Sequence, residues 1–174
     1  NCAYFSPRGD RIVTSSDDFT IKLWDLSGNI LSSKKHHVGE VFYSDFVTDL
    51  NIISVSKDKS VGLFKVTNNE LRFTGQASAD GAKLNSCYLD KQRGIATITF
   101  APGSVVILDV LNNRRINDPI TRKIFTGFKE KITCANYISR DKKIIAANEN
   151  GDLILYDRIN GVNTVIKAHQ AEIR

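Results

Sequence analysis

Paired cysteines and long apolar runs are both missing from this chain of 174 residues. The three cysteines, Cys2, Cys87 and Cys134, lie far apart without a Cys-x-x-Cys spacing, which argues against a disulfide framework and against a zinc site. We therefore expect a reducing compartment and an intracellular, cytoplasmic or nuclear chain. No stretch approaches the roughly 18 to 20 consecutive apolar residues of a membrane-spanning helix, so no membrane span is expected.

Motifs of catalysis, phosphate binding and metal binding are also missing. The sequence contains no G-x-x-x-x-G-K-[ST], G-x-G-x-x-G, H-E-x-x-H or G-x-S-x-G motif and no EF-hand loop. Histidine is limited to His36, His37 and His169. The adjacent carboxylates Asp17 and Asp18 would point to different sides of a turn, so they do not predict an acid/base pair. We expect no enzyme activity, no catalytic residue, no metal site and no cofactor.

The net charge of +5 is unevenly distributed. The first half of the chain carries as many acidic as basic residues, and the excess is densest between residues 114 and 131. The basic residues of this segment are Arg114, Arg115, Arg122, Lys123, Lys129 and Lys131, against Asp118 and Glu130. Such a segment predicts binding to nucleic acid or an anionic surface, which would weaken steeply with salt. The interpretation that we favour is a solvated basic loop.

A sequence pattern recurs four times. The copies are residues 20–25 (TIKLWD), 60–65 (SVGLFK), 104–109 (SVVILD) and 152–157 (DLILYD), which repeat about every 40 to 48 residues. A second β-branched run precedes each copy, at residues 11–16, 51–56, 94–99 and 143–148. Each β-branched run and the copy that follows it are flanked by further short apolar runs and by turns that contain Gly or Asn. We therefore predict an all-β fold of antiparallel four-stranded units.

The first unit resembles a WD repeat, through residues 5–10 (FSPRGD) and 15–25 (SSDDFTIKLWD). The other three resemble it more loosely, which divides the chain into repeats 1–35, 36–76, 77–126 and 127–167 and the start of a fifth at 168–174. The resemblance implies β-propeller blades. Because WD-repeat proteins generally close with about seven blades, it also implies an arc of a larger propeller, completed by blades of the same or another chain. The alternative is a four-bladed ring in which Ile173 and Cys2 complete one strand.

In WD-repeat proteins an aspartate, a histidine, a Ser or Thr and a tryptophan form a buried network that braces each blade. The resemblance assigns such bracing roles to Asp18, Trp24, His37, Asp58 and His169. No unit retains all four residues: Phe64 replaces the tryptophan of the second unit, and Asn150 and Pro102 replace the aspartate of the fourth and third. We expect the third unit to rely on apolar packing and to be the least rigid.

The resemblance implies a non-catalytic scaffold that docks a protein or peptide on a propeller face within a larger complex. Binding residues are expected on loops of a rigid framework, where they depart from the repeat without a packing reason. These candidates are Arg8, Phe19, Lys57, Arg114, Arg115, Arg122 and Lys123. An exposed aromatic residue beside basic groups is typical of an interface anchor, although Phe19 could instead cap the edge of its blade. Nucleic-acid or anionic-surface binding through residues 114–131 is the alternative function.

Overall fold

The structure is a computed structural model of the chain. It describes residues 1–78, 84–101, 103–111, 122–125, 131–138, 143–157 and 159–173, with the backbone alone at residues 78, 122–125 and 162. The described residues form strands and turns and contain no helix, so none of them lies in a helix long and apolar enough to cross a membrane.

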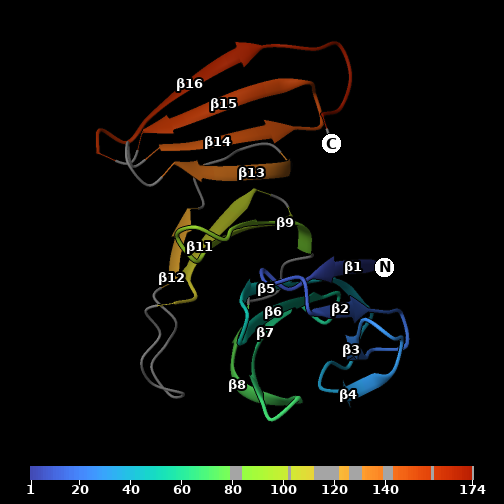
Figure 1. The fold of residues 1–174 in the computed structure, drawn as a ribbon. Helices are drawn as coiled ribbons and strands as arrows, with labels where there is room; N and C mark the ends of the chain where they lie inside the picture. Colours follow the sequence, from blue (N-terminus) through green and yellow to red (C-terminus); the bar gives the residue numbers. More distant parts are fainter. Residues whose placement is uncertain are drawn as a thin grey trace. The chain divides into compact units, whose positions relative to one another are not determined.

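The strands form four sheets that follow one another along the chain, here called blades 1 to 4 (Figure 1). Blade 1 contains β1 (Cys2–Phe5), β2 (Arg11–Ser15), β3 (Ile21–Asp25) and β4 (Ile30–Lys34). Blade 2 contains β5 (Val41–Thr48), β6 (Asn51–Ser56), β7 (Ser60–Thr67) and β8 (Glu70–Ser78). Blade 3 contains β9 (Leu84–Asp90), β10 (Ile95–Phe100), β11 (Ser104–Asp109) and β12 (Arg122–Phe125). Blade 4 contains β13 (Ile132–Ile138), β14 (Lys143–Asn148), β15 (Asp152–Asp157) and β16 (Val162–Lys167).

Each blade joins its strands in sequence order, and the pairs are antiparallel, as in β1–β2, β6–β7 and β15–β16. The predicted all-β fold of four-stranded blades is confirmed. Successive side chains along a strand point to opposite faces of a blade, and one of these faces is more buried than the other. In blade 1, Val13 and Leu23 are cross-strand partners and fully buried, whereas Ile12 and Trp24 form the next pair and are partly exposed.

The chain divides into two compact units. The first comprises Asn1–Gly81, Asp90–Gly94 and Val110–Ile120 and holds blades 1 and 2. Its apolar core joins Val13 and Leu23 of blade 1 to Phe46, Ile52 and Phe64 of blade 2.

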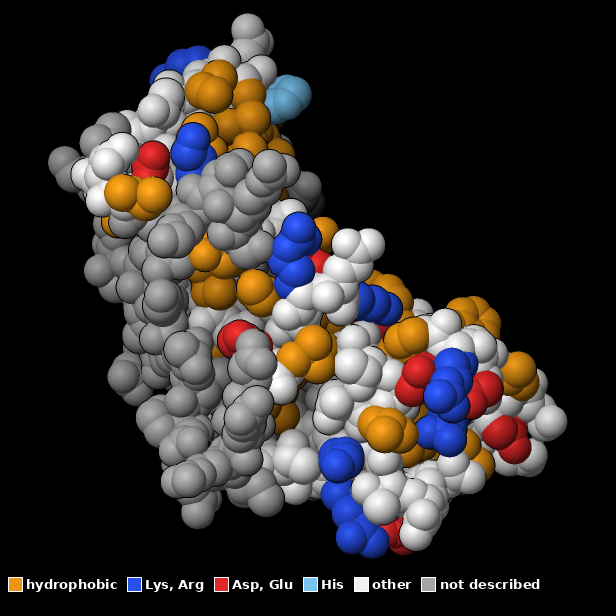
Figure 2. All heavy atoms as spheres, turned by 60° about the vertical axis from the view of Figure 1, so that its left-hand side comes forward, with side chains coloured by type: hydrophobic (Ala, Val, Ile, Leu, Met, Phe, Trp, Pro, Cys, Tyr) orange, Lys and Arg blue, Asp and Glu red, His pale blue; other side chains and the backbone are white. Residues whose placement is uncertain are grey.

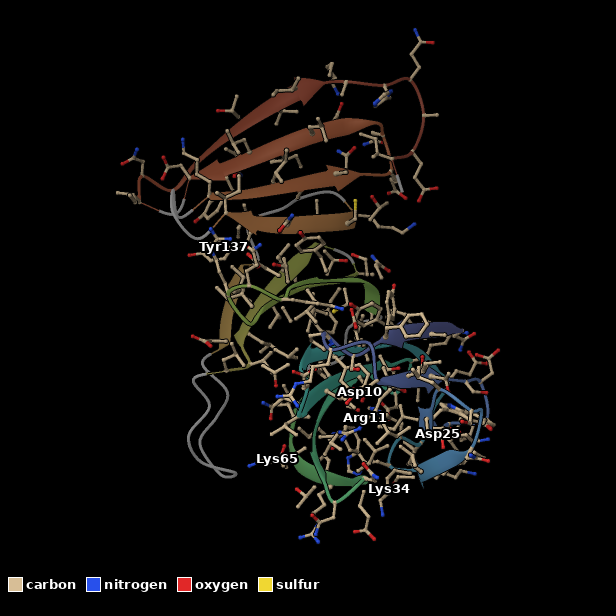
Figure 3. The ribbon with its side chains drawn as sticks, in the orientation of Figure 1. Asp10, Arg11, Asp25, Lys34, Lys65 and Tyr137 are labelled. Carbon is tan, nitrogen blue, oxygen red and sulfur yellow. The ribbon has the colours of Figure 1, made fainter. Side chains whose placement is uncertain are left out.

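The second unit comprises Ala82–Leu89, Ile95–Asp109 and Thr121–Arg174. Its core joins Val105 and Ile107 of β11 to Ile132 of β13 and Ile144 of β14, and Tyr137, labelled in Figure 3, packs against it. Pro102, which replaces the turn aspartate of the third repeat, lies outside the described residues.

Every blade has two ends that differ in the loops they carry. One end carries the β1–β2 and β3–β4 turns of blade 1 and their counterparts, and we call it the hairpin end. The cross-strand partners Arg11 and Asp25 mark it in Figure 3. The opposite end, which we call the connection end, carries the β2–β3 turn and the link to the next blade, residues 35–40 in the case of blade 1. A partner that binds loops therefore contacts either the loops of the hairpin end or those of the connection end.

Candidate interaction surface and blade-bracing network

His37 lies at the centre of a buried polar network in blade 2. Its Nδ1 atom is 3.0 Å from Asp58 Oδ2 and 2.9 Å from Ser60 Oγ, and its Nε2 atom is 2.7 Å from Ser54 Oγ. Asp58 also accepts hydrogen bonds from the amides of Val38 and Ser60, at 3.0 and 2.9 Å. The network ties the β4–β5 connection to β6 and β7. This geometry supports the bracing role that the resemblance assigned to His37 and Asp58.

Ser60 is a member of this network that the sequence analysis missed. Its hydroxyl donates to Asp58 Oδ1 at 2.5 Å, two residues away. A signal was available, because Thr20 follows Asp18 in blade 1 as Ser60 follows Asp58. A hydroxyl two residues after the turn aspartate closes the turn by bonding back to the carboxylate.

Burial controls the charge states of this network. It lowers the pKa of His37 below its ordinary value, against the opposing effect of the Asp58 carboxylate. Burial would by itself raise the pKa of Asp58, but hydrogen bonds from the Ser60 side chain and the Val38 amide hold that pKa below its usual range. The folded state therefore favours a neutral imidazole beside an ionised carboxylate.

Acidification is expected to destabilise the chain through His37. The imidazole of the unfolded chain has a pKa of about 6.5 and the folded one a lower pKa, so below about pH 6.5 the unfolded state binds more protons. The free energy of unfolding is then unaffected by His37 above about pH 6.5. At lower pH it falls by up to about 1.4 kcal/mol per pH unit. Urea denaturation at a series of pH values measures this slope. His37→Gln should flatten it between about pH 7 and 5.5, and an unchanged slope in that variant would contradict the assignment.

Asp18 and Trp24 make separate contacts in blade 1. Asp18 Oδ1 accepts hydrogen bonds from the Thr20 hydroxyl at 2.6 Å and from the Thr20 amide at 2.9 Å, which lowers the pKa of Asp18. Trp24 Nε1 donates to Thr14 Oγ1 at 2.9 Å, across the β2–β3 pair. The carboxylate therefore closes the turn, and the indole links two strands.

Blade 4 holds its buried carboxylate at Asp152 rather than at the predicted turn position. Asp152 accepts hydrogen bonds from Lys167 Nζ at 2.9 Å and from Asn148 Nδ2 at 3.2 Å, and the Lys167 contact lowers the pKa of Asp152. The His169 side chain is exposed, and its amide donates to Gly151 O at 2.9 Å. The structure thus places His169 at the surface and brings a lysine to the buried acid of blade 4.

Phe19 stands in a strained turn at the connection end of blade 1. Its φ is +74°, in the left-handed region, and Lys59 (+71°) and Gly151 (+83°) take the same turn position in blades 2 and 4. A bulky residue in this region costs about 1 kcal/mol or more. Lys35 Nζ lies 5.2 Å from the centre of the partly exposed Phe19 ring. Two loops thereby present an aromatic ring together with an ammonium group.

Lys57 shares the connection end with Phe19, whereas Arg8 does not. The Lys57 ammonium pairs with the Glu40 carboxylate, which raises the pKa of Lys57. The backbone amide of Lys57 also donates to Glu40 O at 2.9 Å. Arg8 lies in the β1–β2 turn at the hairpin end, where Arg8 Nε is 3.3 Å from Asp49 Oδ2. The structure therefore brings Phe19 and Lys57 to one set of loops and places Arg8 on the other.

The remaining candidates fall in the basic segment. Arg114 and Arg115 lie outside the described residues, and so do the side chains of Arg122 and Lys123, whose backbone forms part of β12. Lys131 is described, and its ammonium lies 3.1 Å from Glu149 Oε2. Figure 2 likewise shows Lys and Arg side chains beside acidic ones among the described residues on the face that it displays.

A contact that recurs near the starts of the first strands was also missed. Asn1 Nδ2 donates to Val41 O at 2.9 Å, Asn85 Nδ2 to Ile132 O at 2.7 Å, and Thr133 Oγ1 to Ile173 O at 2.5 Å. The paired residues are 40, 47 and 40 positions apart, close to the length of one repeat. In each case a polar side chain at the start of one first strand bonds the chain about one repeat later.

In the described part of the chain, no set of three or more His, Cys, Asp or Glu side chains lies close enough together to hold a metal ion. The carboxylates described above are instead bonded to histidine, hydroxyl or ammonium groups.

Comparison with known proteins agrees with the blade architecture. The family model described as "WD domain, G-beta repeat" matches residues 1–25, which include β1 to β3. WD repeat-containing protein 70 of Xenopus tropicalis is 23% identical over 184 residues, which cover 95% of this chain and 29% of that protein. The first repeat thus matches the WD-repeat model, and a relative named for WD repeats aligns with nearly all of the chain.

Two other relatives of this chain are longer proteins. Ribosome biogenesis protein YTM1 of Saccharomyces cerevisiae is 27% identical over 105 residues, 60% of this chain and 23% of that protein. Apoptotic protease-activating factor 1 of Mus musculus is 20% identical over 173 residues, 98% of this chain and 13% of that protein. The chain thus spans less than a third of the length of these relatives. WD-repeat proteins are generally non-catalytic scaffolds that bind protein partners in complexes.

Proposed function

We propose that this WD-repeat chain is a non-catalytic scaffold that docks a protein or peptide at the connection end of its blades, within a larger complex. The observation that carries the proposal is the Phe19 ring, which is partly exposed and lies 5.2 Å from Lys35 Nζ. Glycine adopts the left-handed backbone of this turn without strain, as Gly151 does in blade 4, so a phenylalanine there costs stability. Lys59 shares this backbone in blade 2, so the aromatic ring beside an ammonium group is what distinguishes Phe19.

The surroundings of Phe19 suit a protein partner. Lys35 lies over the ring, and the Glu40 pair fixes Lys57 on the same end of the first unit. Aromatic and cationic side chains held on rigid loops provide binding energy at a low entropic cost. The name of YTM1, a ribosome biogenesis protein, supports an intracellular, cytoplasmic or nuclear location.

Phe19→Gly is expected to separate binding from stability. The free energy of unfolding should stay within about 1 kcal/mol of wild type, because released backbone strain offsets the lost ring contacts. The affinity for a partner, first identified by cross-linking and then measured by calorimetry, should fall at least about tenfold.

Lys59→Gly is the matched control for this experiment. It removes a left-handed non-glycine residue from the equivalent turn of blade 2, and should leave the affinity for the partner unchanged. Unchanged affinity in Phe19→Gly, or an equal loss in both variants, would contradict docking through Phe19.

Binding of nucleic acid or an anionic surface through residues 114–131 stays a prediction. Arg114 and Arg115, which would make the contacts with phosphate or another anion, lie outside the described residues. Such binding would weaken steeply as salt rises and would be lost in the double variant Arg114→Ala, Arg115→Ala.

A further inference from the structure

Asp45 of β5 is a buried carboxylate outside the blade-bracing network. Its side chain is only 4% exposed. Asp45 pairs with Ile53 of β6, and the equivalent first-strand positions of blades 1 and 4, which pair with Val13 and Ile145, hold Tyr4 and Asn136. Asp45 is thus a charged departure from the repeat. A buried charge requires a partner of opposite sign.

Lys91 supplies that partner from the β9–β10 turn, within the same compact unit. Its Nζ atom lies 2.7 Å from Asp45 Oδ1 and 5.6 Å from the centre of the Tyr4 ring. The Tyr43 hydroxyl donates to Asp45 Oδ2 at 3.3 Å, and the Tyr43 and Tyr4 rings meet edge to face at 5.7 Å. The ammonium is therefore held by a carboxylate and an aromatic ring together, the two groups that recognise cations most strongly in proteins.

The two sides of this contact are anchored differently. Tyr4, Tyr43 and Asp45 belong to strands β1 and β5, whose ladders fix their backbones. Lys91 extends from a turn on a stem with four rotatable bonds, and its side chain is 41% exposed. Tyr4 is 39% exposed, so the contact is reached from solvent. The strands provide a fixed receptor, and the turn provides an exchangeable ligand.

We propose that Tyr4, Tyr43 and Asp45 form a recognition site for a lysine side chain, which Lys91 fills in the isolated chain and a lysine of a docking protein takes in its place. The β9–β10 turn lies at the hairpin end, so this lysine belongs to a contact separate from the docking proposed at the connection end. The idea that a protein supplies the lysine rests on the proposed scaffold function, whereas the site itself does not. Because the incoming lysine competes with Lys91, the intact chain binds it weakly. Removing Lys91 raises the affinity.

The first experiment tests the site alone by chemical rescue. Lys91→Ala deletes the equivalent of a propylammonium ion and leaves Asp45 without its cation, so Tm should fall by about 5 °C. Millimolar n-propylammonium chloride should restore much of this loss, relative to sodium chloride at equal ionic strength. It should have no such effect on wild type or on Lys91→Ala with Asp45→Asn. If Lys91→Ala is too unstable to titrate, the same rescue is measured in an osmolyte such as sucrose, which stabilises wild type and variants alike.

Arg93→Ala is the matched control, because Arg93 is a basic residue of the same turn whose Nη1 atom pairs with Asp90 Oδ2 at 2.8 Å. It should lower Tm little, and propylammonium should not change its Tm. Absence of rescue in Lys91→Ala, or equal rescue with Asp45→Asn present, overturns the site. Neither result affects docking at Phe19, which Phe19→Gly tests separately.

The second experiment tests the ligand in trans. A short peptide with capped ends, whose single charged side chain is a central lysine, should bind Lys91→Ala at least about tenfold more tightly than wild type, by calorimetry. The same peptide with alanine at its centre should not bind, and adding Tyr4→Leu to Lys91→Ala should weaken binding severalfold by removing the aromatic ring. Equal binding of the lysine and alanine peptides overturns recognition of a partner lysine.

Discussion

His37→Ala is expected to lower the free energy of unfolding by about 3 kcal/mol, because it removes the imidazole from a buried hydrogen-bonded network and leaves a cavity in its place. The ring lies within 3.0 Å of Asp58, Ser54 and Ser60, and its side chain is 1% exposed. Alanine reaches none of these atoms, so the contacts of the imidazole are lost. Urea denaturation followed by the fluorescence of Trp24, the single tryptophan, measures the loss.

The neighbouring His36 supplies the control. Its ring is partly exposed and stacks on Phe73 at 3.7 Å, so His36→Ala should cost only about 1 kcal/mol. In a double-mutant cycle, His37→Ala and Asp58→Asn should be strongly non-additive, because both break the same network. Additive losses, or an equal cost for His36→Ala and His37→Ala, would show that His37 does not brace blade 2.

Gly62→Ala is expected to cost about 2 to 3 kcal/mol, a large effect for one methyl group. A Cβ atom at Gly62 would lie 2.7 Å from Ser54 Oγ, 2.8 Å from Phe64 Cε2 and 3.2 Å from His37 Nε2. The Phe64 ring is fully buried and Ser54 is bonded to His37, so neither side chain moves without breaking other contacts. The same denaturation measurement records the loss.

Two further variants test whether the loss comes from this clash or from any substitution by alanine at this strand position. Lys22→Ala changes the equivalent position of β3 in blade 1 and should cost less than about 0.5 kcal/mol. Phe64→Leu removes the ring that the new methyl group meets, so in its presence Gly62→Ala should be markedly less costly. The clash with Phe64 is refuted if Gly62→Ala costs the same in both backgrounds.

Much of the fold followed from the sequence because a repeat of short β-branched runs predicts strands locally. The pairs of Val13 with Leu23 and of Ile53 with Leu63 lie in segments predicted as strands. The proximity of His37 and Asp58 was equally accessible, because it depends on the register of one repeat. The site was less predictable: Phe19 and Arg8 were grouped as binding candidates, but the two turns lie at opposite ends of blade 1.

The sequence by itself determined the local features of this chain: its strands, its four blades and the turn positions within them. These depend on side-chain alternation and turn residues, which act over a few positions. Only the tertiary structure decided that Lys91 neutralises Asp45 and that Asn1 bonds Val41. These contacts join residues 46 and 40 positions apart, and they exist because packed strands and turns bring particular side chains within bonding distance. Local periodicity does not specify such distances, since they are fixed by the packing between sheets.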